Sequence, residues 1–586
     1  MTDLIQSTAR HAREIPGNDA VVFVTGHGKD AVTRTLGYGR MVQDAQSVAA
    51  ELRTHCEPGD RVLLLFPSGL EFIKGFLGCL YAGLVPVPVP LPGRGSSQRR
   101  RTTGVLLDCE ATAVLTDRDT LPEVADWLEQ EEQSQVRCVV TESVPQIAPE
   151  RYVWPRPEPE QLCFLQYTSG STSEPKGVMV GHGNLAHNFG ELRALLGMRA
   201  DSTVCSWLPL FHDMGLIAAL LLPLHLGLRT VLMSPTDFVR RPYAWLELIH
   251  AHRATHSFAP NFGYNLAART VTEDHLARLD LSSWRCAANG AEPVHAQTME
   301  LFAKRLAPTG FRATALRPAY GLAEATLGVT ATALDQEPPV ALVDRADLER
   351  NLFRPRPDGS PLVSCGSPVG LEVRIVDPAT RRVLPDGEIG EIWLRGGSIA
   401  PGYWARPEIN AQVFDAADAD GGRGHLRTGD LGVLHEGQLY VTGRIKDVLI
   451  VNGRNLYPHD IERECGELHP AFAGLSASVF SVPGDGGGED LVVVQEVRQA
   501  KVAGGDLTAL AGEVKLALSR SLGVPVGNVV LLKPGKVRRT TSGKIQRSAM
   551  RGLFLAAELE PLHEDLAPRT RAQYRPAAVT EDGAGA

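Results

Sequence analysis

Short runs rich in Val, Ile and Leu alternate with longer stretches of mixed polarity along the first 140 residues. The runs 61–66, 113–116 and 136–140 have the length of buried strands, whereas 70–82 and 121–132 have the length and pattern of helices. Strands that are separated by helices pair into parallel sheets through crossover connections. This alternation therefore predicts an α/β fold.

The pattern changes toward the carboxyl end of the chain. From about residue 366 to 440 the apolar runs are shorter and punctuated by Gly and Pro, which predicts an antiparallel, barrel-like subdomain. Residues 459–555 predict a compact α+β module. Its expected helices and strands are 460–468 and 507–522, and 476–482 and 491–497. A chain of 586 residues exceeds one core, so two or more domains are expected, the second beginning just after Arg444.

Composition narrows the class of protein. A formal net charge of -9 argues against non-specific binding to nucleic acid or to an anionic membrane. One basic run, formed by Arg94, Arg99, Arg100 and Arg101, lies in a Gly/Ser context, where a solvated loop is favoured over a phosphate-binding role.

Targeting and membrane signals are weak. The first residues lack the apolar core of a signal peptide. The most apolar stretch, 214–233, is interrupted by Pro223, His225 and Arg229, which predicts a buried helix, a turn and a strand instead of stable membrane insertion. Nine cysteines without a CxxC pair favour reduced thiols in a cytoplasmic enzyme.

The sequence from Gln166 to Gly177, QYTSGSTSEPKG, carries a hydroxyl at every position from 168 to 173 except Gly170. Such a loop offers side-chain and backbone donors to polyphosphate oxygens, and Lys176 adds a positive charge. Pro175 stands where a Walker A loop needs Gly, so that motif is excluded. A flexible Ser/Thr linker is disfavoured because apolar, strand-like runs flank the loop on both sides.

This loop resembles the phosphate loop of the adenylate-forming superfamily, which contains acyl-CoA synthetases, amino-acid adenylation domains and luciferases. Further segments resemble the family's motifs in the family's order: WLPLFHDMG (207–215), NGAEP (289–293), YGLAE (320–324), RTGD (427–430), GRIKD (443–447) and TTSGK (540–544). The resemblance covers most of the chain. One position departs from it: Ser173 replaces the usual Gly of the loop, from which we expect altered ATP affinity rather than loss of activity.

The resemblance implies an ATP site and a Mg²⁺ site. Glu324 would hold Mg²⁺, Tyr320 would stack on adenine, Asp430 would meet both ribose hydroxyls, and Arg444 would lie near the ribose. The full set implied to bind ATP or AMP is Thr168, Ser169, Gly170, Ser171, Thr172, Lys176, Asn289, Gly290, Ala291, Glu292, Tyr320, Gly321, Asp430 and Arg444.

The resemblance also implies two catalytic residues and a hinge. Lys544 would stabilise charge that develops between the carboxylate and the α-phosphate, and His212 would lie beside the acyl carboxylate. Lys446 would be the pivot. The implied fold is a large α/β domain of two αβαβα-type sheets plus a small β-barrel (1–445), a mobile α+β lid domain (446–565) and a disordered tail (566–586).

Within the superfamily the chain looks most like the fatty acyl-AMP ligases, which pass the acyl group to an acyl carrier protein. Supporting segments are LMSPTDFVRRPYAWL (232–246), APNFGYNLAART (259–270), LDLSSWRCAANGAEPV (279–294) and GRNLYPHDIE (453–462). The long spacer 331–365 resembles an insertion of those ligases, with an ordinary surface loop as the alternative reading. The implied partners are a fatty acid and a carrier protein acting in trans, in lipopeptide or polyketide assembly.

Besides a fatty acyl-AMP ligase, two other hypotheses remain open. The same chemistry fits an acyl-CoA synthetase, and the same fold fits a non-catalytic binding protein, although the joint presence of Lys176, Glu324, Asp430 and Lys544 favours catalysis. An amino-acid substrate is disfavoured because no acidic residue stands at Asn261 or its neighbours. The acyl pocket is less constrained: Phe211, Phe258 and Phe262 either line an alkyl tunnel or belong to the core.

Overall fold

The computed structural model describes residues 3–26, 31–93, 96–148, 153–154, 156–168, 175–451, 454–483, 489–540 and 543–575. The chain forms two compact units. The larger unit takes its described residues from 3–344 and 355–441, and the smaller unit takes them from 345–354 and 442–575. Each unit is described by itself below.

A nine-stranded sheet forms the centre of the larger unit, with the strand order β17-β14-β13-β12-β11-β9-β10-β1-β2. Six neighbouring strands, from β13 to β1, are parallel, and the strands added at either edge are antiparallel. The strands are β1 (Asp19–Thr25), β2 (Val32–Gly37), β9 (Thr203–Ser206), β10 (Arg229–Met233), β11 (His256–Ala259), β12 (Cys286–Asn289), β13 (Leu316–Gly321), β14 (Gly328–Ala331) and β17 (Ser367–Pro368).

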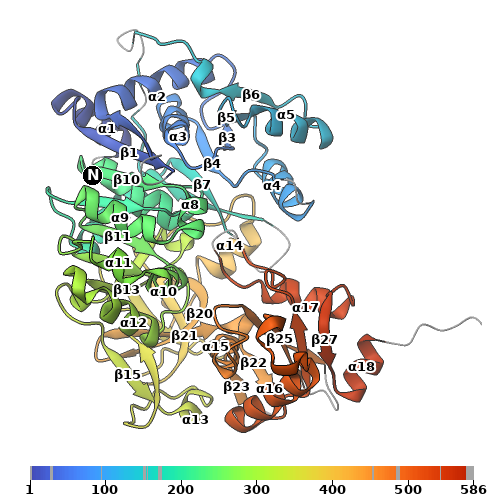
Figure 1. Ribbon diagram of the computed structural model, residues 1–586. Coiled ribbons are helices and arrows are strands. Elements are labelled where there is room, and N and C mark those ends of the chain that lie inside the picture. Colours follow the sequence, from blue (N-terminus) through green and yellow to red (C-terminus); the bar gives the residue numbers. More distant parts are fainter. Residues whose placement is uncertain are drawn as a thin grey trace, which may run out of the picture. The chain divides into compact units, whose positions relative to one another are not determined.

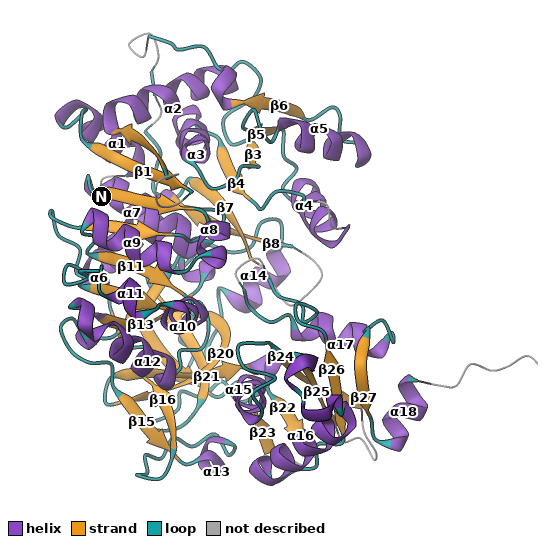
Figure 2. Ribbon diagram, in the orientation of Figure 1, coloured by secondary structure: helices purple, strands orange, loops and turns teal. Residues whose placement is uncertain are grey.

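A second, parallel sheet of four strands has the order β4-β3-β5-β6. Its strands are β3 (Arg61–Leu64), β4 (Val85–Pro88), β5 (Ala113–Thr116) and β6 (Arg137–Val140), with helices between them in sequence (Figure 2). Three of these strands coincide with the apolar runs in the sequence, so the predicted α/β fold is confirmed here.

Smaller antiparallel elements complete the larger unit. The predicted region 366–440 forms a four-stranded antiparallel sheet in chain order, β18-β19-β20-β21. These strands are β18 (Glu372–Val376), β19 (Gly390–Arg395), β20 (Leu426–His435) and β21 (Gln438–Arg444). Two hairpins join them: β7 (Leu162–Thr168) with β8 (Lys176–Gly181), and β15 (Val340–Val343) with β16 (Ser360–Val363).

Helices surround both large sheets of this unit (Figure 1). They are α1 (Leu4–Glu14), α2 (Tyr38–Leu52), α3 (Leu70–Ala82), α4 (Ser96–Asp108), α5 (Leu121–Gln130), α6 (His182–Leu196), α7 (Leu222–Leu226), α8 (Pro235–Arg240), α9 (Tyr243–His252), α10 (Asn261–Thr270), α11 (Glu273–Leu276), α12 (Ala296–Leu306) and α14 (Pro407–Val413).

The smaller unit is an α+β module. Its four-stranded sheet has the order β24-β25-β26-β27, formed by Ala477–Pro483, Glu489–Glu496, Asn528–Leu532 and Pro561–Asp565. A hairpin of β22 (Leu449–Val451) and β23 (Arg454–Leu456) precedes it. The helices are α13 (Arg345–Leu348), α15 (Pro458–Leu468), α16 (Leu507–Leu522), α17 (Arg547–Leu555) and α18 (Pro568–Tyr574).

Helix α16 shows why the sequence pattern locates these helices well. Asp506 precedes it, and its carboxylate accepts hydrogen bonds from the backbone N–H groups of Thr508 and Ala509 at 3.0 and 2.9 Å. Gly523 ends the helix in the left-handed conformation, with φ +64°. Both ends of α16 therefore carry a local capping residue, and the observed bounds of the helix are those predicted.

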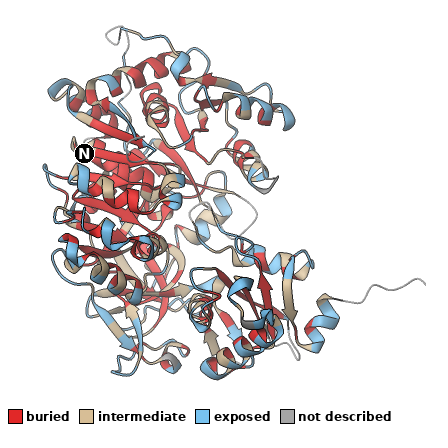
Figure 3. Ribbon diagram, viewed as in Figure 1, coloured by how far each residue is buried: buried red, intermediate tan, exposed pale blue. Residues whose placement is uncertain are grey.

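The most apolar stretch of the sequence lies in the core of the larger unit (Figure 3). It forms a π-helix (Met214–Leu221), helix α7 and strand β10, as predicted for a buried helix, a turn and a strand. Within the described part of the chain, no helix combines the length and apolarity that crossing a membrane requires.

Two segments differ from what the sequence predicts. Arg99, Arg100 and Arg101 lie in helix α4, where a solvated loop was expected, and Arg94 lies outside the described residues. The expected disordered tail begins at residue 566, but helix α18 spans Pro568–Tyr574. Arg575, which follows that helix, binds the Glu564 carboxylate through Nη2 at 2.8 Å and so attaches this segment to β27.

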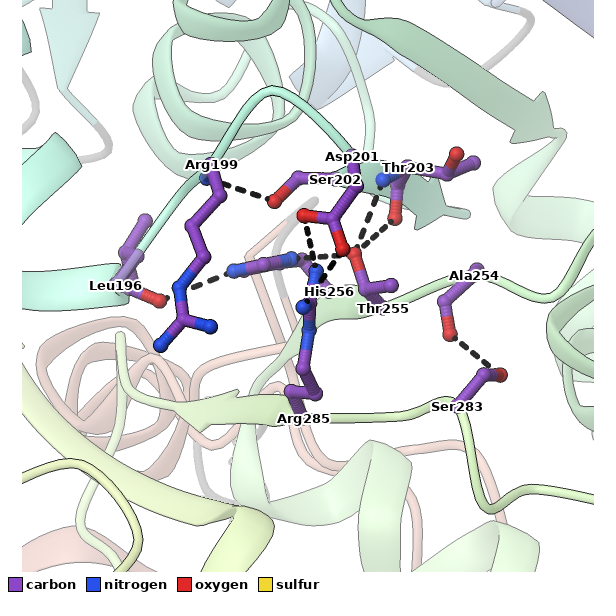
Figure 4. Close-up of polar contacts among 10 residues, drawn as sticks. All are labelled: Leu196, Arg199, Asp201, Ser202, Thr203, Ala254, Thr255, His256, Ser283 and Arg285. Atoms are coloured by element: carbon purple, nitrogen blue, oxygen red, sulfur yellow. Dashed lines mark hydrogen bonds and ion pairs between the residues drawn. The ribbon is translucent and has the colours of Figure 1, made fainter.

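A polar cluster lies at the amino-terminal edge of the parallel strands (Figure 4). His256 begins β11 and is only 1% exposed; its Nε2 lies 3.0 Å from the Leu196 carbonyl oxygen and its Nδ1 lies 2.7 Å from the Thr255 hydroxyl. Nearby, the Arg285 guanidinium binds both oxygens of Asp201 at 3.0 Å. Burial lowers the pKa of His256 to about 4.

The buried His256 makes stability depend on pH. Between about pH 6.5 and pH 4 the unfolded chain takes up a proton at this residue while the folded chain does not, so stability falls as pH falls through that window. From pH 7.5 to 5 we expect a loss of about 2 kcal/mol from this group. His256→Gln should reduce that loss.

The measurement is urea unfolding followed by tryptophan fluorescence. All seven tryptophans lie between residues 127 and 404, so the signal reports the larger unit. The matched control is His187→Gln, because His187 is an exposed histidine of the same unit, and it should keep the wild-type pH dependence. An unchanged slope in the His256 variant would contradict the assignment.

Candidate active site

The expected phosphate loop is the turn of the β7–β8 hairpin. Thr168, the last residue of β7, pairs with Lys176, the first residue of β8. The hairpin strands carry the apolar residues that the sequence shows on either side of the loop. The loop residues between them, Ser169, Gly170, Ser171, Thr172 and Ser173, lie outside the described residues.

Tyr403 connects two residues that the sequence assigns to phosphate and metal. The Lys176 ammonium lies 5.4 Å from the centre of the Tyr403 ring, and the Tyr403 hydroxyl donates to Glu324 Oε1 at 2.6 Å. The Glu324 backbone is held as well, because its carbonyl accepts from the Ala400 N–H at 2.9 Å. The predicted phosphate-binding lysine and metal-binding carboxylate therefore converge on one aromatic side chain.

Tyr403 is itself fixed at both backbone groups. The Asn410 side chain accepts from its N–H at 2.7 Å and donates to its carbonyl at 2.8 Å. The next residue, Trp404, donates its N–H to the Gly177 carbonyl at 2.7 Å, which attaches the segment to β8. Sequence analysis missed Tyr403, since its partner Glu324 is 79 residues away and no spacing rule connects them.

The surroundings of Glu324 fit a Mg²⁺ ion. Within the described residues no group of three or more His, Cys, Asp or Glu side chains could hold a metal by protein ligands alone. Tyr403 is the one described side chain that is hydrogen-bonded to the Glu324 carboxylate, and it uses Oε1. Mg²⁺ commonly takes one or two carboxylates and completes its shell with water and phosphate oxygens, so Oε2 suits such a site.

The residues expected at adenine and ribose contact each other. The Tyr320 hydroxyl donates to Asp430 Oδ2 at 2.8 Å, and the two residues are 9% and 5% exposed. Gly321 follows Tyr320 at the end of β13; a Cβ atom there would lie 2.0 Å from the Leu327 carbonyl oxygen, so only glycine fits. The fold brings together two residues that are 110 positions apart.

The segment from Asn289 to Glu292 begins with the last residue of β12 and lies at the carboxyl edge of the large sheet. Ala291 adopts a left-handed conformation with φ +67°, which turns the chain sharply after the strand. Glu292 Oε1 accepts from the Phe262 N–H at 2.5 Å and so fixes the start of α10. Ligands of open α/β sheets bind beyond this edge, where Asn289, Gly290 and Ala291 are placed.

His212 lies just before the π-helix. Its Nδ1 is 2.6 Å from Asp213 Oδ1, so the neighbouring carboxylate orients the ring. The Phe211 carbonyl accepts from Gln166 Nε2 at 2.9 Å, which attaches this segment to β7 beside the phosphate loop. A Cβ at Gly215 would lie 2.2 Å from the Pro209 carbonyl oxygen, so the turn that presents His212 requires glycine.

Three buried polar atoms near this edge have no hydrogen-bond partner among the described residues: Gln166 Oε1, Trp207 Nε1 and Asn289 Oδ1. Gln166 lies near the end of β7, Trp207 follows β9 and Asn289 ends β12. A buried polar atom without a partner costs free energy unless something else binds it. These atoms are additional candidates for ligand contacts, and only their places at strand ends mark them in the sequence.

The phenylalanines of the expected acyl pocket occupy different surroundings. Phe258 is 1% exposed within β11 and belongs to the main core. Phe262 packs edge-on against Trp207, with ring centres 5.8 Å apart. Trp207 in turn stacks on Phe238 at 3.8 Å. Phe262 and the partly buried Phe211 remain predictions for the pocket, whereas Phe258 packs as a core residue.

The smaller unit holds Lys544, Lys446 and Arg444. Lys544 is exposed on a turn closed from both directions: the Thr540 hydroxyl accepts from the Lys544 N–H at 3.0 Å, and the Thr540 N–H donates to the Lys544 carbonyl at 2.7 Å. Lys446 is exposed within a short 3-10 helix (Ile445–Asp447) that follows Arg444 at the end of β21.

An ion-pair network inside the smaller unit joins the expected hinge to the loop that carries Lys544. Arg547 donates to both oxygens of Glu462, at 2.7 and 2.6 Å, and its Nη1 lies 3.2 Å from Asp447 Oδ2. Asp447 is next to Lys446, and Arg547 begins α17, three residues after Lys544. The hinge segment and the lysine loop are therefore parts of one packed body.

The spacer that resembles the ligase insertion divides between the units. Its hairpin strands β15 and β16 belong to the larger unit, whereas residues 345–354 between them belong to the smaller one. There Glu349 Oε2 accepts from Arg454 Nε at 2.7 Å and from Arg454 Nη2 at 2.6 Å. This packing replaces the ordinary surface loop that was the alternative reading of the spacer.

Known proteins are similar to this chain over most of its length. The family model described as AMP-binding enzyme matches residues 8–404. The chain is 40% identical over 538 residues to "Medium-chain-fatty-acid--[acyl-carrier-protein] ligase JamA" of Moorena producens, covering 90% of this chain and 91% of that protein. It is 40% identical over 534 residues to "Long-chain-fatty-acid--AMP ligase FadD26" of Mycobacterium marinum, covering 88% and 90%.

Solved structures of fatty acyl-adenylate ligases are also similar to this chain. A structure from studies of fatty acyl-adenylate ligases from E. coli and L. pneumophila is 31% identical with a TM-score of 0.84, covering 95% of this chain and 98% of that one. The L. pneumophila fatty acyl-adenylate ligase in complex with acyl adenylate and pyrophosphate is 34% identical with a TM-score of 0.74, covering 96% and 97%. The chain therefore belongs to the family of AMP-binding, adenylate-forming enzymes, in the branch of the fatty acyl-AMP ligases.

Proposed function

We propose that this enzyme uses ATP to convert a fatty acid into an acyl-adenylate, and then passes the acyl group to the phosphopantetheine thiol of an acyl carrier protein. The contact of Lys176 and Glu324 with Tyr403 carries the proposal, because it supports a site in which a cation and a carboxylate suited to a metal ion lie near the β7–β8 hairpin. The relatives JamA and FadD26, at 40% identity over most of the chain, support the choice of a fatty acid.

The first step joins the acid to AMP. A carboxylate oxygen forms a bond to the α-phosphorus, the bond from that phosphorus to the β-phosphate bridging oxygen breaks, and pyrophosphate leaves with the electron pair. The enzyme contributes positioning and charge neutralisation. Tyr320 and Asp430 hold the nucleoside, His212 lies beside the reacting carboxylate, and Lys544 stabilises the charge that develops between the two reactants.

Bound Mg²⁺ would neutralise charge on the phosphate oxygens of ATP, and Glu324 is the residue that would hold it. Lys176 adds a second positive charge from β8. In the second step the carrier thiol sulfur attacks the acyl carbon, AMP leaves, and the thiol proton passes to solvent. An acyl carrier protein as acceptor is supported by the name of the relative JamA, an acyl-carrier-protein ligase, and by the spacer segment 345–354.

The cellular setting follows from the cysteines. All nine lie in described residues and are free thiols, eight of them buried. Burial raises the pKa of several of these thiols, for example Cys286 to about 11, which keeps them protonated and unreactive. We place the enzyme in the reducing cytoplasm on this basis.

The function is tested in two assays. Fatty-acid-dependent exchange of labelled pyrophosphate into ATP should proceed without any thiol acceptor, with chain lengths compared in one panel. Transfer should then occur to a phosphopantetheinylated carrier protein and not to coenzyme A. Exchange that is absent with every carboxylic acid would refute adenylation, whereas efficient thioester formation with coenzyme A would instead identify an acyl-CoA synthetase.

Lys544→Ala should reduce acyl-adenylate formation about a hundredfold or more, because it removes a positive charge that acts in the transition state. The affinity for ATP should stay within about threefold. Lys536→Ala is the matched control, since Lys536 is an exposed lysine of the same unit that pairs with Glu560. Adenylate formation by the Lys544 variant at a rate near that of the control would refute the role.

Lys446→Pro tests the hinge. Proline fixes φ near −65°, so it restricts the backbone at the position that we assign as the pivot. We expect pyrophosphate exchange within about threefold of wild type and acyl transfer to the carrier slowed by about tenfold or more. Single-turnover measurements separate the two steps, and equal loss in both would contradict the assignment.

Tyr403→Phe removes the hydroxyl that positions Glu324 while keeping the ring beside Lys176. We expect the Mg²⁺ concentration for half-maximal activity to rise by about tenfold, since a charge-assisted hydrogen bond contributes about 1.5–3 kcal/mol. Mn²⁺ binding in the presence of ATP, followed by electron paramagnetic resonance, should weaken in parallel. Tyr243→Phe is the control, and equal metal affinity in both variants would contradict the role.

A further inference from the structure

Helix α4 lies against the hairpin that carries the phosphate loop. The Tyr167 hydroxyl, one residue before the end of β7, donates to Asp108 Oδ2 at 2.6 Å. A Cβ atom built on Gly104 would lie 3.6 Å from Cγ of Pro175, which immediately precedes Lys176. Asp108 and Gly104 thus mark the side of α4 that faces the two ends of the phosphate loop.

Arg101 lies on that same side of α4. Residues three and seven positions apart share one side of an α-helix, so Arg101 is aligned with Gly104 and Asp108. At a rise of about 1.5 Å per residue it lies roughly 5 Å along the helix axis from Gly104. Its long side chain therefore starts within one helical turn of the contact with Pro175.

Arg101 is partly buried without a counter-ion. Among the described residues no carboxylate pairs with its guanidinium and no carbonyl accepts a hydrogen bond from it, and burial lowers its pKa. Its neighbours differ: Arg99 donates to the Gly93 carbonyl at 3.0 Å, and Arg100 is exposed to solvent. A desolvated arginine without an anion is unfavourable in the free protein, which is the expected state of a residue whose anion is a ligand.

The loop of the phosphate hairpin would then have two cations near it, Lys176 and Arg101. Lys176 contacts the uncharged Tyr403 ring, so its charge is also available to an anion. The guanidinium of Arg101 presents several donors in a fixed plane and suits bidentate contact with phosphate oxygens. We propose that Arg101 binds the β- and γ-phosphates of ATP and the pyrophosphate that they form on leaving.

The identification of pyrophosphate as a product rests on the proposed function, whereas the binding contact does not. In Arg101→Met, which keeps the length of the stem and removes the charge, the affinities for Mg·ATP and Mg·pyrophosphate measured by calorimetry should each fall by about tenfold or more. Affinity for AMP, which lacks those phosphates, should stay within twofold. Arg100→Met, the exposed neighbour on the same helix, should bind all three like wild type.

Stability gives a second readout. Because Arg101 is a partly buried charge without a counter-ion among the described residues, the Arg101→Met protein should unfold at a temperature no lower than wild type, although it binds the anions more weakly. A structural role would lower that temperature and weaken AMP binding as well. If Arg101→Met does not fold, Arg101→Lys, which keeps a charge but loses the planar donors, should weaken pyrophosphate binding by at least twofold with an unchanged unfolding temperature.

Wild-type affinity for pyrophosphate in the Met variant, or in the Lys variant where only that one folds, would overturn the proposal, as would equal weakening toward AMP. All three ligands are measured without a carboxylic acid or a carrier. The binding measurements therefore test the role of Arg101 even if the enzyme does not activate fatty acids. If they show that Arg101 does not bind these phosphates, the proposed acyl chemistry is not affected, because pyrophosphate exchange tests it separately.

Discussion

The hydrogen bond from Tyr403 to Glu324, with Lys176 over the same ring, is the contact on which the proposed chemistry depends. A lysine and a glutamate close to one nucleotide would neutralise each other if they formed an ion pair. No such pair joins Lys176 and Glu324 in the described part of the chain, because the aromatic ring contacts the ammonium and the hydroxyl holds the carboxylate. Each charge therefore remains available, one for phosphate and one for a metal ion.

The two edges of the large parallel sheet are built differently. At the amino edge the polar groups are matched: His256 contacts Leu196 and Thr255, and Arg285 binds both oxygens of Asp201. At the carboxyl edge Gln166, Trp207 and Asn289 keep buried polar atoms without partners among the described residues. Matched groups stabilise the fold. Groups without a partner in the described part of the chain, which include Arg101, lower stability and are available to a ligand.

The smaller unit combines the proposed hinge, Lys446, and the proposed catalytic lysine, Lys544, in one body. Arg547 binds Glu462 and Asp447, so a rotation about Lys446 would carry the loop of Lys544 with it instead of deforming that loop. Residues 345–354 also belong to this unit although their flanking strands belong to the other. Within the described residues the chain therefore passes between the two units three times, at 344/345, at 354/355 and at 441/442.

The sequence by itself determined the elements whose signals are local. Alternating apolar runs located β3, β5 and β6, and caps such as Asp506 and Gly523 fixed α16, because burial pattern and capping act within a few residues. The order of the motifs predicted Lys176, Glu324, Tyr320 and Asp430 as site residues. In the larger unit Tyr320 contacts Asp430, and Lys176 and Glu324 both contact Tyr403.

Only the tertiary structure decided how those residues meet. Tyr403 joins Lys176 to Glu324, and helix α4, which carries Arg101, contacts the phosphate hairpin through Gly104 and Asp108. These contacts join segments that are far apart in the chain. Sequence reasoning placed Arg101 in a solvated loop because a basic run next to Gly and Ser carries no information about its neighbours. Whether a charge is paired, buried or exposed depends on what packs against it, and that is a property of the folded chain.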